Sequence, residues 1–94
     1  MPVKEVVVYV VHESALAGLA EASAAMDRFL ATRPGFKGRV VLPDATKARH
    51  YMDLVDWASL EEAQEAMQAA EKEESVAAFM QSIESIELAS HFLQ

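Results

Sequence analysis

The pattern of apolar and polar residues in the first half of the chain predicts three strands and a helix. Residues 3–11, VKEVVVYVV, are nearly continuous in β-branched residues, which is typical of a strand buried on both faces. Apolar residues at helical spacing predict a helix over residues 14–32, ended by a Pro-Gly step. Residues 36–42 and about 50–57 predict two further strands, joined by a turn-rich hairpin connection.

The second half of the chain predicts a well-defined helix and a closing strand. Ser59 followed by Glu62 forms a capping box, which marks a helix start. The buried stripe of that helix is expected to comprise Leu60, Ala63, Ala66, Met67 and Ala70. A short further helix follows, and the alternation in residues 85–94 predicts the last strand.

The resulting order, β-α-β-β-α-(α)-β, predicts one domain over residues 1–94 with a ferredoxin-like α+β fold. In this split βαβ plan, a four-stranded antiparallel sheet carries its helices on one face. The first and third strands are apolar on both sides, so the face without helices also needs a cover. A second copy of the same sheet is the simplest cover, and we therefore expect a homodimer.

Composition and charge narrow the range of partners. With 8 basic and 15 acidic residues the net charge is -7, which repels nucleic acid and anionic membranes. The chain has no cysteine, so disulfides and thiolate chemistry are excluded. The first residues lack the layout of a signal peptide, and their apolar run is too short to span a bilayer. The expected location is the cytoplasm.

The third predicted strand carries an unexpected carboxylate. Because a strand alternates faces, Asp53 shares one side with Trp57, while Met52 and Leu54 share the other. A helix-covered position has no water to solvate a carboxylate, whereas a cavity between two subunits does. We therefore expect Asp53 and Trp57 to point into one such cavity, and Met52 and Leu54 to pack under the helices.

Two roles for Asp53 are compatible with its position. A raised pKa would suit a catalytic general base that removes a phenolic or enolic proton. Alternatively, Asp53 is structural: it is hydrogen-bonded to Tyr9 or Tyr51, or it pairs with a basic residue across the dimer interface. Under the first role, Asp53→Asn leaves the fold largely intact and changes ligand binding or turnover. Trp57, Tyr9 and Tyr51 are candidate substrate-binding residues, because they combine an apolar ring with a polar edge.

The segments RPGFKG and YMDLVDWASLEEA resemble the antibiotic biosynthesis monooxygenase-like proteins, which are small dimeric α+β barrels. The matching residues are Pro34, Gly35, Trp57 and the capped helix that follows. The resemblance implies a homodimer whose two sheets face each other around a hydrophobic cavity, with Trp57 in the cavity wall. Members of the family include cofactor-independent oxygenases of polycyclic phenols and quinones, haem-degrading enzymes and proteins of unknown role.

Three departures separate this chain from the characterised members. Val55 stands where many members have an acidic residue, the helix after Trp57 has no histidine, and the chain has no asparagine. Haem-degrading and phenol-oxidising members use an asparagine, so its absence weighs against both chemistries; haem binding is disfavoured, and no cofactor is expected. The leading hypothesis is a cofactor-independent monooxygenase acting on an aromatic or polyketide-like substrate. The alternative is a non-catalytic metabolite-binding or structural protein of the same fold.

The remaining polar residues carry weaker signals. Three scattered histidines do not predict a metal site, so no structural metal is expected. His12 and His50 are interpreted as rim residues. His91 is a candidate substrate-binding residue, although both faces of its strand are apolar and leave its direction open. Arg39 and Arg49 could clamp an anionic substrate, but surface charge is the simpler interpretation.

Overall fold

The computed structural model describes residues 1–94. Four strands form a single sheet, and three helices connect them. In chain order the elements are β1 (Val3–Val11), a 3-10 helix (Glu13–Gly18), α1 (Leu19–Leu30), β2 (Phe36–Pro43), β3 (His50–Trp57), α2 (Leu60–Glu71), a second 3-10 helix (Glu74–Val76), α3 (Ala77–Ser82) and β4 (Ile83–Leu93).

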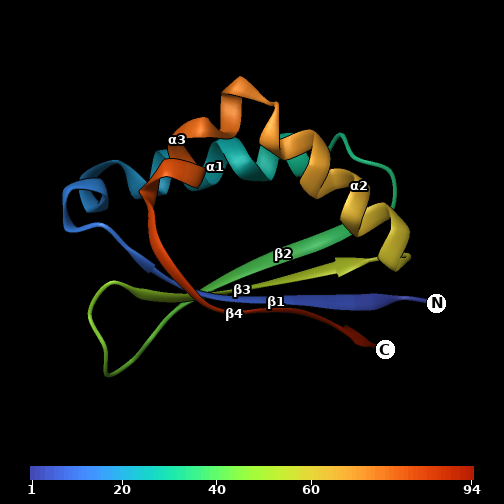
Figure 1. Cartoon of the computed structure of the whole chain (residues 1–94), viewed down its shortest axis with the longest axis horizontal. Helices are drawn as coiled ribbons and strands as arrows, with labels where there is room; N and C mark the ends of the chain where they lie inside the picture. The colour runs from blue at the N-terminus through green and yellow to red at the C-terminus, as the bar shows by residue number, and fades with distance from the viewer.

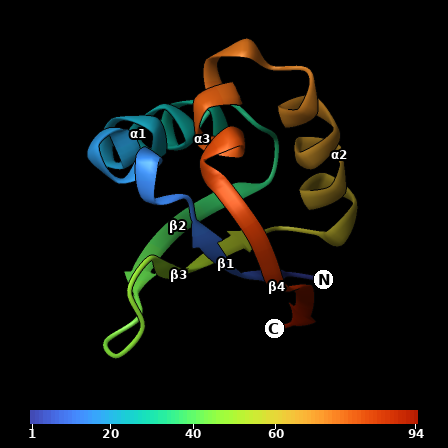
Figure 2. The ribbon, with the colours of Figure 1, turned by 60° about the vertical axis from the view of Figure 1, so that its left-hand side comes forward.

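The sheet is antiparallel throughout, with the strand order β2-β3-β1-β4. All three helices lie on one face of it, and the other face is uncovered (Figures 1 and 2). The predicted ferredoxin-like α+β fold is therefore confirmed, including the central place of β1. The chain ends also lie together, because the Gln94 N–H donates to the Pro2 carbonyl at 3.0 Å.

Two local signals begin and end elements as predicted. Gly35 adopts φ 82°, a left-handed conformation that suits glycine, in the turn between α1 and β2. At the start of α2, the Glu62 N–H donates to the Ser59 hydroxyl at 3.2 Å, and this hydroxyl donates to the Glu62 carboxylate at 3.0 Å. These contacts fix the entry of α2 directly after β3.

The buried side of α2 is narrower than predicted. Only alanines are buried on it, namely Ala63, Ala66 and Ala70. Leu60 and Met67, which were expected in the same stripe, are 41% and 43% exposed. Helix α2 therefore presents short side chains to the sheet, which leaves space beneath it.

The pairing of β4 with β1 settles the direction of the last strand. His91 pairs with Glu5 and Ile86 with Tyr9, and a bulge between these pairs shifts the register. Directly paired residues in an antiparallel sheet point to the same face. His91 therefore lies on the helix side of the sheet.

The two faces of β3 are the reverse of the expectation. Asp53, Val55 and Trp57 are buried beneath the helices, whereas Met52 and Leu54 lie on the uncovered face and are partly exposed. The alternation was predicted correctly, but its assignment to the faces was wrong, so water in a cavity between subunits no longer supports a catalytic role for Asp53. The reason is that other side chains satisfy the Asp53 carboxylate under the helices, so water from a subunit interface is not required.

Candidate functional site

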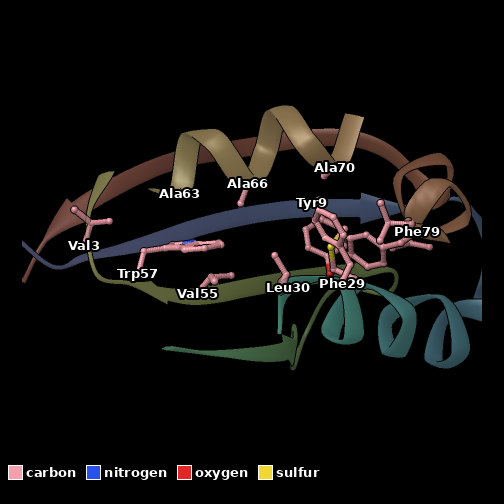
Figure 3. Packing of buried hydrophobic residues seen from close by; sticks show 13 residues of the cluster. Val3, Tyr9, Phe29, Leu30, Val55, Trp57, Ala63, Ala66, Ala70 and Phe79 are labelled. Carbon is pink, nitrogen blue, oxygen red and sulfur yellow. The ribbon is translucent and has the colours of Figure 1, made fainter. Parts of the chain in front are cut away.

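The helix side of the sheet gathers the aromatic residues of the core. Trp57 lies toward one end beneath Ala63 of α2, and Tyr9 lies with Phe79 toward the other end (Figure 3). Tyr9 meets the Phe79 ring edge-on with centroids 6.0 Å apart, and Trp57 meets Phe36 edge-on at 5.6 Å. Edge-to-face pairs of this kind add to the energy of burial.

A cavity of about 150 Å³ lies between these aromatic residues and the helices. Fourteen of its seventeen lining residues are hydrophobic, and the remaining three are Glu5, Arg39 and Asp53. The alanines of α2 form part of its wall, and the short side chains buried beneath that helix leave the space that the cavity occupies. Met67 and Ile86 also line the cavity and are 43% and 57% exposed, which places its mouth between α2 and β4.

The position of this cavity corrects one implication of the family resemblance. Asp53 and Trp57 were expected in a cavity between two facing sheets, but the cavity that they line is within one chain, between sheet and helices. Asp53 and Trp57 nevertheless share it, as their alternation predicted.

Asp53 is held by donors from both neighbouring strands. The Tyr9 hydroxyl on β1 donates to Oδ1 at 2.6 Å, and Nε and Nη2 of Arg39 on β2 donate to Oδ2 at 3.1 and 2.8 Å. Both donors lie diagonally across the sheet from Asp53, a spacing that long side chains bridge. Both carboxylate oxygens are thus occupied.

Arg39 is itself almost completely buried, with 1% of its side chain exposed. Its Nη1 donates to the Asp27 carboxylate at 2.8 Å and to the Ser23 hydroxyl and carbonyl at 2.9 and 3.1 Å. Burial opposes the positive charge, but the Asp53 and Asp27 carboxylates outweigh it and raise the pKa of Arg39 above its ordinary value. The guanidinium therefore remains charged inside the fold.

Tyr9 is held in its neutral form. Burial, the hydrogen bond to Asp53 and the charge of that carboxylate raise the pKa of Tyr9 far above its ordinary value of about 10. The Tyr9 hydroxyl donates its hydrogen bond to Asp53. The lone pairs of the hydroxyl oxygen therefore remain available to accept a hydrogen bond from another group.

A second polar group stands at the Trp57 end of the cavity. The Trp57 indole N–H donates to Oε1 of Glu5 at 2.9 Å, again diagonally between β3 and β1. Nε2 of His91 lies 4.0 Å from the same oxygen. The Glu5 side chain is only 12% exposed.

The structure brings some of the predicted site residues together and separates others. Asp53, Trp57 and Tyr9 line the cavity. Tyr51 and His91 are not lining residues, but each touches one: the Tyr51 ring stacks on Tyr9 with centroids 6.0 Å apart, and His91 approaches Glu5. Their proposed role in substrate binding remains a prediction.

Two cavity residues were missed or misread in the sequence. The interpretation of Arg39 as surface charge was wrong, because its side chain is buried against Asp53. Glu5 was not considered, although it has the same parity as Val3, Val7 and Tyr9 on its strand. A charged residue within a strand that is otherwise apolar on both faces was the available signal.

Two kinds of feature are absent from the structure. No group of three or more histidine, aspartate or glutamate side chains is arranged to hold a metal ion. None of the helices has the length and apolar character needed to cross a membrane.

The fold recurs in solved structures. A protein from Bordetella bronchiseptica that carries the provisional name antibiotic biosynthesis monooxygenase superimposes with a TM-score of 0.85 at 15% identity, over 99% of this chain and 96% of the other. A variant of SnoaB, a cofactor-independent oxygenase from Streptomyces nogalater, gives 0.77 at 20% identity, over 99% and 92%. This chain shares the fold of the antibiotic biosynthesis monooxygenases. The family resemblance noted in the sequence is thereby supported at the level of fold.

The same architecture also occurs without an assigned activity. A conserved protein from Methanosarcina mazei gives a TM-score of 0.78 at 8% identity, over 100% of this chain and 93% of the other. No protein-family model matches the sequence, and the search of curated proteins finds no match. The assignment of function therefore depends on the site.

Proposed function

We propose that this protein binds a small aromatic or polyketide-like molecule in its cavity and acts on it as a cofactor-independent monooxygenase. One observation carries the proposal: the cavity is apolar, with its few polar groups converging on it from the sheet. Such a combination is characteristic of small-molecule sites. A volume of about 150 Å³ suits one aromatic ring. A polycyclic substrate would extend through the mouth beside Met67 and Ile86.

The proposed chemistry begins with removal of a proton from a phenolic or enolic hydroxyl. The Tyr9 hydroxyl accepts a hydrogen bond from the substrate and donates its own proton to Asp53, so that a proton can pass along this pair. Asp53 then serves as the proton acceptor through Tyr9. Dioxygen adds to a ring C–H carbon of the resulting electron-rich anion, and the proton taken up by Asp53 returns to give a hydroperoxide. Loss of water from this hydroperoxide, with the hydrogen of the same carbon, leaves a carbonyl there. General base catalysis of this kind contributes roughly 10²- to 10⁴-fold in rate.

A non-catalytic binding protein is the second candidate, and the contacts of Asp53 favour it. Three hydrogen bonds already occupy both oxygens of this carboxylate. Arg39 donates two of these bonds and Tyr9 the third, so no oxygen of Asp53 is left free for a substrate. Under this reading the Tyr9–Asp53–Arg39 network holds the cavity open, and the ligand leaves chemically unchanged.

Oxygen uptake with anthrone as probe distinguishes these functions. The monooxygenase should convert anthrone to anthraquinone, and heavy-isotope dioxygen should label one carbonyl oxygen in the product, as detected by mass spectrometry. Ala66→Leu, which projects a longer side chain into the cavity, should abolish turnover. Ala20→Leu, on the exposed side of α1, is the matched control. Unlabelled product, or no product above the rate of heat-denatured protein, would leave the binding function in place of the enzymatic one.

We further propose that the active form is a homodimer that pairs the uncovered faces of two sheets. The open face is mostly apolar: it carries Val6, Val8, Val40, Leu42, Met52, Leu54, Leu88 and Phe92, together with Ser90 and the Lys4–Asp56 pair. A second copy offers the same apolar surface, so the contact is self-complementary.

A further inference from the structure

We propose that Glu5 recognises the hydroxyl group of the ligand and selects molecules with a hydrogen-bond donor over isosteres without one. This inference rests on the proposed function, because it names the chemistry that the cavity accepts. Two carboxylates line the cavity, those of Asp53 and Glu5.

The two carboxylates differ in how completely they are satisfied. Both oxygens of Asp53 accept hydrogen bonds, and a buried guanidinium balances its charge. Glu5 accepts only the indole N–H of Trp57, on Oε1, and Oε2 receives no hydrogen bond from the chain. His91 approaches the same Oε1 at 4.0 Å and leaves Oε2 unoccupied.

Glu5 Oε2 is reached by solvent, because Arg33 Nε is the one fully buried side-chain atom without a hydrogen-bond partner. A ligand that displaces water from Oε2 must therefore supply a donor in its place. The Glu5 side chain is 88% buried, and hydrophobic residues form most of the wall around it. A carboxylate accepts hydrogen bonds but cannot donate them when ionised. A phenolic or enolic hydroxyl satisfies it, whereas a carbonyl or methyl group in the same place does not.

This selectivity matches the direction of the proposed reaction. The substrate is the reduced molecule, which carries a hydroxyl donor. Oxidation to a quinone converts donors into carbonyl acceptors, whose lone pairs face those of Glu5. Glu5 would thus raise the affinity for the substrate and lower the affinity for the product.

Trp57 supplies a direct readout for a test. It is the only tryptophan in the chain, so the proton NMR spectrum contains a single indole N–H signal, and this group donates to Glu5 beside the cavity. Phenol and toluene form an isosteric pair of probes, with a hydroxyl or a methyl group on one ring. Titration of each probe while following the indole N–H signal gives both affinities.

The comparison uses Glu5→Gln, which keeps the shape and an oxygen for the Trp57 N–H but removes the charge. We expect its affinity for phenol to fall about tenfold, since hydrogen bonds to charged groups are the stronger ones, and its affinity for toluene not to fall. Glu5→Met removes the hydrogen-bond acceptor and should lower the affinity for phenol at least as much. Glu65→Gln removes the same charge from the exposed side of α2 and should change neither affinity.

Equal changes for the two probes in Glu5→Gln, or no change for phenol, would overturn the role of Glu5 and leave the cavity as a binding site. Failure of both probes to bind the unaltered protein would overturn this inference together with the proposed binding function. Oxygen uptake is measured separately, so absence of turnover with normal selectivity for phenol would count against the monooxygenase alone.

Discussion

Arg39 shows how a charge is accommodated beneath the helices. Its guanidinium donates to Asp53, Asp27 and Ser23, and it lies over the Phe79 ring at 5.0 Å from the centroid. The hydrogen bonds satisfy its donors, and the aromatic face adds a cation–π contact. One arginine therefore ties β2 to β3, to α1 and to α3.

Replacing Arg39 should expose the cost of an unpaired buried carboxylate. In Arg39→Met, Asp53 retains only the Tyr9 hydroxyl, so we expect a loss of about 3 to 5 kcal/mol in the free energy of unfolding, measured with urea. Arg28→Met, at an exposed position of α1, is the control and should change stability by less than about 0.5 kcal/mol. Equal effects of both variants would show that the buried pair does not stabilise the fold.

The hydrogen bonds that Asp53 accepts from Tyr9 and Arg39 change the expected effect of Asp53→Asn. From the sequence alone this substitution should leave the fold largely intact. An asparagine amide, however, has only one acceptor oxygen and turns its N–H₂ toward Tyr9 or Arg39. A loss of stability should therefore accompany any change in turnover, and the two effects need separate measurements.

Tyr9 predicts a dependence of stability on alkaline pH. Its pKa is raised in the folded state, so the folded chain keeps a proton that the unfolded chain loses above a pH of about 10. Stability from this group is complete below that pH and declines as pH rises further, by about 1.4 kcal/mol per pH unit.

Absorbance of tyrosinate checks this dependence directly. One of the two tyrosines should stay neutral until the chain unfolds. Tyr9→Phe should reduce the decline of stability above pH 10, although it lowers stability at neutral pH by removing a hydrogen bond to Asp53. Titration of both tyrosines in the folded chain near pH 10 would contradict the account.

At the scale of elements, the turn after α1 is fitted to the start of α2. Gly35 has φ 82°, and a Cβ on it would overlap the side chain of Glu62 in the capping box. The Ala58 N–H also donates to the Gly35 carbonyl at 2.8 Å. The glycine thus allows the turn before β2 to approach the junction between β3 and α2.

Gly35→Ala should therefore destabilise the chain by at least about 1 to 2 kcal/mol, the cost of a left-handed conformation for a residue with a side chain. Gly38→Ala is the control, since no atom lies within 4 Å of a Cβ there and its φ is not positive. Thermal unfolding of both variants measures the difference. A smaller effect at Gly35 than at Gly38 would mean that the turn readily adopts another conformation.

The sequence predicts the features that local patterns report, and it misses those that depend on residues far apart in the chain. Apolar runs and the capping box located β1, β3 and α2, because periodicity reports local structure. They did not decide which face of β3 meets the helices, since β1 is apolar on both sides. That choice depends on Arg39, fourteen residues from Asp53, and such pairing is not visible in local periodicity.

The sequence predicted only the part of the cavity that follows from alternation along β3. Alternation correctly put Asp53 and Trp57 in one wall. The alanines of α2 were visible in the sequence, but a stripe of small residues does not show whether space remains beneath it. Glu5 joins the site only through the pairing of β1 with β3.

At the scale of the whole molecule, the two faces of the sheet differ in kind. The helix side holds the buried core and the cavity, whereas Val40, Leu42, Leu88 and Phe92 on the other side are each more than 40% exposed. Contiguous apolar surface of this kind is uncommon in a monomer. The rim of the uncovered face includes the Lys4–Asp56 ion pair at 3.5 Å.

Sedimentation equilibrium at micromolar concentration should give about twice the mass of one chain. Val40→Lys should shift the chain toward monomer, because it buries a charge in the proposed interface. Gln64→Lys, on the exposed side of α2, adds the same charge and should remain dimeric. A monomer for the unaltered chain, or no effect of Val40→Lys, would contradict the proposed arrangement.

The diagonal hydrogen bonds of the site bear on strand alignment during folding. Valines on both faces of β1 offer apolar partners in more than one alignment, so β1 alone does not set the register, although a shift of β3 by one residue would also turn Trp57 out of the core. That shift would turn Asp53 to the uncovered face and leave Arg39 buried without its partner. It would also separate Trp57 from Glu5. The polar residues of the cavity thus exclude misaligned sheets that the valines would tolerate, and weakening them should increase misfolded pairings as well as lower stability.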